Sequence, residues 1–158
     1  MILTEKEKID WINQNITNDF IKKILNGDVP KILKYYCRKS SQQKLNRIAP
    51  YIDKHKVYII PFFEDEFSIF CVKILGDKNI YCSYILEEDK FEDYGQSIQS
   101  IFKYILFCLF EIGEYEDAEL IDLGEKLGIK NAAQFISQIK TSDLNEEDFE
   151  KWLVDQYR

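Results

Sequence analysis

The sequence predicts an α+β domain in which an antiparallel β-meander packs with N-terminal and C-terminal helices. Hydrophobic residues recur at helical spacing up to about residue 56, and β-branched and aromatic runs then fill positions 57–86. Helical spacing returns from residue 97. Helices before and after a meander are typical of α+β proteins. The 158 residues contain no repeat or linker, so we expect one domain over residues 1–158.

The first third of the chain carries helix start and stop signals. The letters TEKE at positions 4–7 have the form of a capping box and predict a helix over residues 5–16. The pattern continues over residues 20–25 to a stop at Asn26-Gly27. Asp28 then predicts the cap of a helix reaching residue 36, and serines 40–41 predict the cap of another that Pro50 disturbs.

Three strands are predicted next, over residues 57–63, 67–75 and 79–86, divided by turns at residues 64–66 and 76–78. Pro61 has no backbone donor, so we expect the first strand to lie at an edge or to carry a bulge. The second strand is apolar on almost both faces. This pattern predicts that layers cover it on both sides.

The C-terminal part predicts four helices. Ser97 begins the longest, and its aliphatic and aromatic side chains on most sides indicate deep burial. Shorter helices are expected over residues 116–127, 131–140 and 145–156, the last two with asparagine caps.

The net charge of the chain limits the classes of partner that we expect it to bind. Lys and Arg total 21 against 28 Asp and Glu, giving a net charge of −7. Such a field repels phosphate backbones and anionic lipids, so we expect neither nucleic acid nor membrane as a partner. A basic protein partner fits the sign better.

Cysteine usage predicts a reduced, cytoplasmic protein. Cys37, Cys71, Cys82 and Cys108 are scattered in apolar contexts with no CxxC pair, and the first residues show no signal-peptide pattern. With His55 as the single histidine, zinc is not expected. No glycine-rich phosphate loop is present, so no cofactor is predicted.

Acidic residues gather where the meander predicts that two segments meet. The first and third strands of a meander run in the same direction, so the segments that leave them emerge at the same end of the sheet. We call this group the acidic rim. It comprises the carboxylates Glu64, Asp65, Glu66, Glu87, Glu88, Asp89, Glu92 and Asp93, with the aromatic neighbours Phe63, Phe67, Phe91 and Tyr94.

The acidic rim has several interpretations. It is a surface for a basic protein, with aromatic side chains as anchors, or a set of ordinary solvated turns. A magnesium-dependent hydrolase site built from Asp65, Glu88 and Lys90 is a further alternative. Self-association, through the aromatic meander or through the C-terminal helix with Trp152, Leu153 and Tyr157, is another. Binding without catalysis is the interpretation that we carry forward.

The central part of the chain resembles the SUKH superfamily over about residues 28–111. The features that carry the resemblance are the strand YIIPFF at 58–63, the acidic turn 64–66, the strands that follow, and the helix opened by Ser97. The segment DVPKILKYY at 28–36 is similar to the Leu-Pro-x-x-Tyr segment of the family.

The resemblance implies an α+β fold and a function. Many bacterial SUKH proteins are immunity proteins encoded beside polymorphic toxins. By that likeness we expect this chain to neutralise a cognate toxin, often a nuclease, by direct binding rather than by catalysis, and to act as a non-enzymatic protein.

Overall fold

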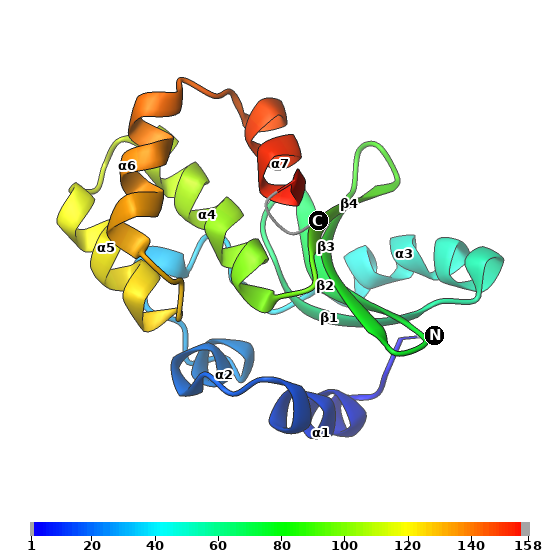
Figure 1. The fold of residues 1–158 in the computed structure, drawn as a ribbon. Coiled ribbons are helices and arrows are strands. Elements are labelled where there is room, and N and C mark those ends of the chain that lie inside the picture. Colours follow the sequence, from blue (N-terminus) through cyan, green and yellow to red (C-terminus); the bar gives the residue numbers. More distant parts are fainter. Residues whose placement is uncertain (1, 156–158) are drawn as a thin grey trace.

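A four-stranded antiparallel sheet with strand order β1-β2-β3-β4 lies between helices on both faces (Figure 1). The computed structural model describes residues 2–155. In chain order its elements are α1 (Glu5–Asn15), α2 (Asp19–Leu25), the 3-10 turn η1 (Lys31–Leu33), α3 (Gln42–His55), β1 (Tyr58–Glu64), β2 (Ser68–Leu75), β3 (Lys78–Ile85), β4 (Lys90–Gly95), α4 (Ile98–Ile112), α5 (Asp117–Lys126), α6 (Ala132–Ser142) and α7 (Glu146–Asp155). The α+β meander with helices from both ends is therefore confirmed.

Strand β2 is covered on both sides, as its sequence predicts. Phe70 and Val72 belong to the larger core cluster, which α1, α2, α4 and the C-terminal helices complete. Ile69 and Cys71 point to the opposite face, where Ile48 and other side chains of α3 cover them. All four β2 residues are completely buried.

The capping box at the N-terminus is confirmed. The Thr4 hydroxyl accepts the Glu7 N–H at 3.3 Å, and the Thr4 N–H donates to the Glu7 carboxylate at 2.8 Å. Asn18 caps α2 by accepting the Ile21 N–H at 2.9 Å. The predicted helix over residues 28–36 is reduced to η1, because the chain turns after it to run beside the outer edge of β1.

Helix α3 extends beyond Pro50 to His55, whereas the sequence predicts a disturbance at the proline. Ile48 and Ile52, one turn apart, are both buried against the sheet. The side chain of Pro50 is on the exposed side of the helix. Burial of the isoleucines on both sides of the proline stabilises a helix that local preference disfavours.

The structure adds a fourth strand, β4, where the sequence predicts an acidic loop after three strands. Two aromatic side chains of β4, one on each face of the sheet, contact β3. Phe91 packs edge-on against Tyr84 with ring centroids 5.0 Å apart. Tyr94 is buried, and its hydroxyl lies 2.8 Å from the Ser83 hydroxyl.

Pro61 occupies the kind of position that its missing N–H predicts. β1 is an edge strand, and its register against β2 shifts between Pro61 and Phe63.

The C-terminal helices form as predicted, but only one of the two predicted asparagine caps is present. Ser97 accepts the Gln99 N–H at 3.2 Å at the start of α4. Asn145 accepts the Asp148 N–H at 2.8 Å, whereas Asn131 adopts a left-handed conformation and makes no side-chain cap. Residue 156 of the last predicted helix lies outside the described residues. Within residues 2–155, no helix is long and apolar enough to cross a membrane.

Replacing Pro50 tests the continuity of α3. Pro50→Ala should raise the free energy of unfolding by about 1 to 2 kcal/mol. The restored N–H stabilises the helix interior by more than the greater freedom of the unfolded chain destabilises the fold. Urea denaturation measures the change. Pro30→Ala, outside any α-helix, is the control and should give no such gain. An unchanged or lowered stability for Pro50→Ala would mean that α3 is not continuous at this point.

Candidate functional site

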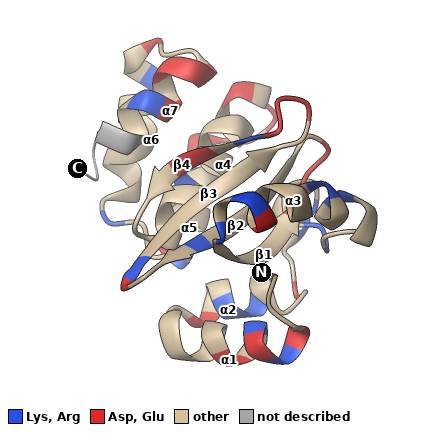
Figure 2. Ribbon diagram, turned by 90° about the vertical axis from the view of Figure 1, so that its right-hand side faces the viewer, with Lys and Arg blue, Asp and Glu red and all other residues tan. Residues whose placement is uncertain are grey.

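The two acidic segments of the rim do meet at one end of the sheet. The Leu86 N–H in the β3–β4 turn donates to the Phe67 carbonyl beside the β1–β2 turn at 2.9 Å. Acidic residues of these turns, of β4 and of α7 share this part of the molecule (Figure 2). The rim residues nevertheless have distinct environments, which separate structural roles from surface roles.

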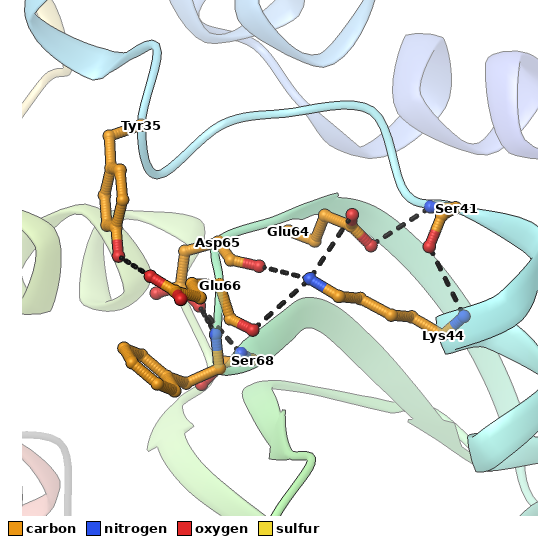
Figure 3. A network of polar contacts seen from close by, with 8 residues as sticks. Tyr35, Ser41, Lys44, Glu64, Asp65, Glu66 and Ser68 are labelled. Carbon is orange, nitrogen blue, oxygen red and sulfur yellow. Dashed lines mark hydrogen bonds and ion pairs between the residues drawn. The ribbon is translucent and has the colours of Figure 1, made fainter.

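Glu64 anchors the start of α3 (Figure 3). Its carboxylate accepts the Ser41 N–H at 3.0 Å and lies 3.5 Å from the Lys44 ammonium. The same ammonium donates to the carbonyls of Asp65 at 2.7 Å and Glu66 at 3.3 Å. Since Glu64 is only 7% exposed, its carboxylate binds groups of this chain and is not accessible to a partner.

Asp65 and Glu66 shape the β1–β2 turn. One Asp65 carboxylate oxygen accepts the N–H groups of Phe67 at 2.9 Å and Ser68 at 2.7 Å. Burial raises the pKa of Asp65, although those two hydrogen bonds favour its charged form. Glu66 is exposed and accepts the Tyr35 hydroxyl at 3.1 Å. Asp65 is thus a turn-forming residue, and Glu66 lies on the surface.

Two further carboxylates of the rim are ion-paired. Asp89 lies 3.2 Å from the Arg47 guanidinium of α3 and accepts the Tyr84 hydroxyl at 3.0 Å. Asp93 lies 2.6 Å from the Lys73 ammonium of β2. Much of the charge that the sequence assigns to a common rim is therefore neutralised within the chain.

The four aromatic residues of the rim also divide. Phe63 and Tyr94 are 2% and 1% exposed, so they are core side chains with too little surface to contact a partner. Phe91 is half-buried, with the Lys73 ammonium 5.0 Å from its ring centre. Phe67 is 53% exposed and is the rim aromatic that a partner can reach.

A hollow of about 980 Å³ opens beside the rim, between the sheet and α7. We call it the acidic hollow. Its lining residues are Asp65, Phe67, Ser68, Ile85, Glu88, Lys90, Glu92, Asp93, Tyr94, Tyr104, Glu146, Glu147, Glu150 and Lys151. Seven carboxylates and two lysines therefore surround it.

The α7 side of the acidic hollow is absent from the residues that the sequence predicts for the site. Phe149 holds α7 in place by stacking on Phe107 of α4 at 4.1 Å between ring centroids. Glu146 and Glu150 are one helical turn apart and both line the hollow. Helical spacing could have placed these two carboxylates on one side of α7, but no local signal indicates which part of the sheet that side meets.

The two lysines of the hollow are already paired with carboxylates. The Lys90 ammonium lies 2.6 Å from Glu88 and 2.8 Å from Glu92, and these hydrogen bonds raise its pKa. Lys151 lies 2.7 Å from Glu147. Each lysine thus forms ion pairs, but the carboxylates of the hollow still outnumber the lysines.

Glu150 is the carboxylate with the most unfavourable environment. Burial first, and then the nearby charges of Glu92 and Glu146, raise its pKa to about 7. Within the described residues it makes no hydrogen bond or ion pair, whereas Glu146 accepts the hydroxyl of Tyr104. A cation placed in the hollow could therefore form an ion pair with Glu150 without displacing another partner among the described residues.

The residues of the hydrolase alternative, Asp65, Glu88 and Lys90, all have partners within the chain. Asp65 is bound by two backbone N–H groups, and Lys90 is held charged between two glutamates. Among residues 2–155, no group of three or more histidine, cysteine, aspartate or glutamate side chains is placed to hold a metal ion.

Two of the C-terminal side chains considered for self-association, Leu153 and Trp152, make contacts within the chain, and Tyr157 lies outside the described residues. Leu153 is completely buried, and Trp152 stacks on Phe135 with centroids 6.2 Å apart.

Comparison of the chain with protein-family models, with curated proteins and with solved structures finds no match. The likeness to the SUKH superfamily therefore stays a prediction from the sequence.

Substituting Glu150 tests the electrostatics of the hollow. Its folded pKa lies above its ordinary value of 4.5, so the folded protein holds a proton that the unfolded chain releases, and this group destabilises the fold as pH rises from about 4.5 to 7. Glu150→Gln should therefore gain about 1 kcal/mol at pH 8 and almost nothing at pH 5. The gain is below the full value of the shift because solvent screens a half-exposed group.

Thermal or urea unfolding at both pH values measures this difference. The control is Glu147→Gln on the same helix, where pairing with Lys151 lowers the pKa of the carboxylate, so no gain at pH 8 is expected. An equal gain at both pH values would contradict the assignment.

Replacing Glu64 tests its structural role. Glu64→Ala should cost about 1 to 3 kcal/mol, because it leaves the Ser41 N–H without its acceptor and the Lys44 ammonium without its carboxylate partner. Glu66→Ala removes a neighbouring exposed carboxylate and should change stability by less than about 0.5 kcal/mol. Equal effects in urea denaturation would show that Glu64 does not anchor α3.

Proposed function

We propose that this chain is a cytoplasmic immunity protein of the SUKH type that neutralises a toxin domain, most simply a nuclease, by binding it through the acidic hollow. The observation that carries the proposal is the charge of the hollow. Seven carboxylates surround it against two lysines, and both lysines are already paired.

A nuclease domain needs a basic surface to bind phosphates. The carboxylates of the hollow would bind that basic surface in place of the phosphates. Its carboxylates lie on the β3–β4 turn, on β4 and on α7, so they surround an inserted side chain from several directions. Complementary charge raises the rate of encounter and disfavours acidic competitors. The net charge of −7 adds long-range attraction of the same sign.

Phe67 supplies the apolar part of the contact. It lines the hollow and is half-exposed, although a phenylalanine gains more by burial. Aromatic side chains are enriched in protein interfaces, whose rims are polar. Asp65 is engaged by the backbone of its own turn, and Asp93 is paired with Lys73. The contact set is therefore Phe67 with the other five carboxylates of the hollow: Glu88, Glu92, Glu146, Glu147 and Glu150.

Affinity capture followed by a growth test examines this function. The tagged chain is used to capture proteins from its native lysate, and the retained protein is identified by mass. We expect one stoichiometric basic protein, with affinity reduced at least tenfold between 50 and 500 mM salt. Expressed alone, that protein should arrest growth, and co-expression with this chain should restore it.

Charge reversal locates the contact. The double variant Glu88→Lys with Glu150→Lys should lose capture and protection, whereas Asp53→Lys, an exposed substitution on α3, should keep both. Capture of a protein with no toxicity, or equal capture by the two variants, would contradict the proposal.

A further inference from the structure

The two edges of the sheet differ. The outer edge of β1 is covered: Ile2 forms a parallel bridge with Ile59, and Arg38 exchanges two backbone hydrogen bonds with Glu64 at 2.8 and 3.1 Å. Along the outer edge of β4, no backbone bridge or hydrogen bond to another segment is present among residues 2–155. Within the described part of the chain, the outward backbone groups of β4 therefore have no strand partner.

The hydrogen bonds of β3 identify which groups of β4 point outward. Because the Leu86 N–H donates to the Phe67 carbonyl, the even-numbered backbone groups of β3 face β2. Phe91 and Asp93 are paired with even-numbered residues of β3. Their own N–H and C=O groups therefore point away from the sheet.

We propose that the open edge of β4 binds an extended, lysine- or arginine-rich segment of the partner as a fifth strand. This inference rests on the proposed function and gives its binding mode. Backbone hydrogen bonds to Phe91 and Asp93 supply the pairing, and basic side chains supply the selectivity.

The position of the acidic hollow explains why the added strand is basic. Side chains alternate along β4, so Glu92 points toward α7 and the hollow, whereas the Asp93 carboxylate, although Asp93 lies at the margin of the hollow, is paired with Lys73 of β2. An added strand alternates in the same way. Every second side chain would lie beside Glu92 and point toward Glu150 on α7, where a long basic side chain finds its counter-charge.

Charge also decides against a second copy of this chain as the occupant. Residues 88–93 contain four carboxylates and one lysine. Pairing two β4 edges would bring eight carboxylates and two lysines together, and like charges across a strand pair are destabilising. A basic segment reverses the sign of that interaction.

A peptide of four lysine-valine repeats, capped at both ends, is the first probe. At low salt, NMR should show shifts in β4 and at least tenfold slower exchange of the Phe91 and Asp93 amide protons. The matching peptide of glutamate-valine repeats should produce neither. Absence of binding at millimolar peptide, or shifts confined to α7, would overturn the proposal. Slow exchange without peptide in a sample that is dimeric by native mass would also overturn it.

Backbone methylation separates strand pairing from simple charge attraction. Two versions of the lysine-valine peptide carry N-methyl groups on all lysines or on all valines, with unchanged charge. Only one of these residue sets can direct its N–H groups to β4, so one version should lose binding and the other keep it. Equal binding by both versions would overturn the strand mode.

Proline substitution applies the same test to the protein. Asp93→Pro removes an outward N–H, which an edge strand tolerates, and Asp93→Ala removes the same side chain but keeps the N–H. Circular dichroism checks that both fold. Asp93→Pro should bind the peptide at least tenfold more weakly than Asp93→Ala. If both capture the toxic partner equally, the proposed function stands and the strand mode fails; if neither the variants nor the unsubstituted chain captures one, the function itself fails.

Discussion

The burial of β2 on both faces is the constraint on which the rest of the structure depends. A strand with phenylalanine and valine on one face and isoleucine and cysteine on the other needs two separate layers. The chain therefore passes around the edge of β1 so that α3 reaches one face while the other helices cover the opposite face. Glu64 fastens that passage by holding Ser41 and Lys44 at the start of α3.

This arrangement also divides the acidic residues into two groups. On the α3 side, Lys44, Arg47 and Lys73 compensate Glu64, Asp89 and Asp93. On the α7 side, the carboxylates outnumber the lysines, and burial adds to their mutual repulsion at Glu150. Carboxylates that are neighbours in sequence thus either stabilise the fold or create a surface that attracts cations.

Local signals predict much of the fold because they act within one or two turns of chain. The capping box at Thr4, the cap at Ser97 and the two-sided apolar pattern of β2 each determine nearby backbone. β4 escapes such a prediction because Glu92 and Asp93 separate Phe91 from Tyr94, so the segment shows no alternation of apolar and polar residues. Pro50 misleads because the buried isoleucines on either side, rather than local preference, decide the path of α3.

The site is less predictable than the fold because it depends on packing between distant residues. The turns that carry Asp65 and Glu88 could be brought together from strand direction alone. The stacking of Phe149 on Phe107 places Glu146 and Glu150 opposite them, and no pattern near residue 146 indicates that contact. The burial of Phe63 and Tyr94 likewise follows from which face of the sheet each side chain takes.

The covered edge of β1 has a consequence for assembly. A sheet with two open edges can add strands in both directions, which is the geometry that leads to fibrils. Here Ile2 and the backbone of Arg38 occupy one edge, so growth from that side has no template. Only the β4 edge could accept a strand, so one chain would bind one partner strand. The result would be a finite one-to-one complex rather than a polymer.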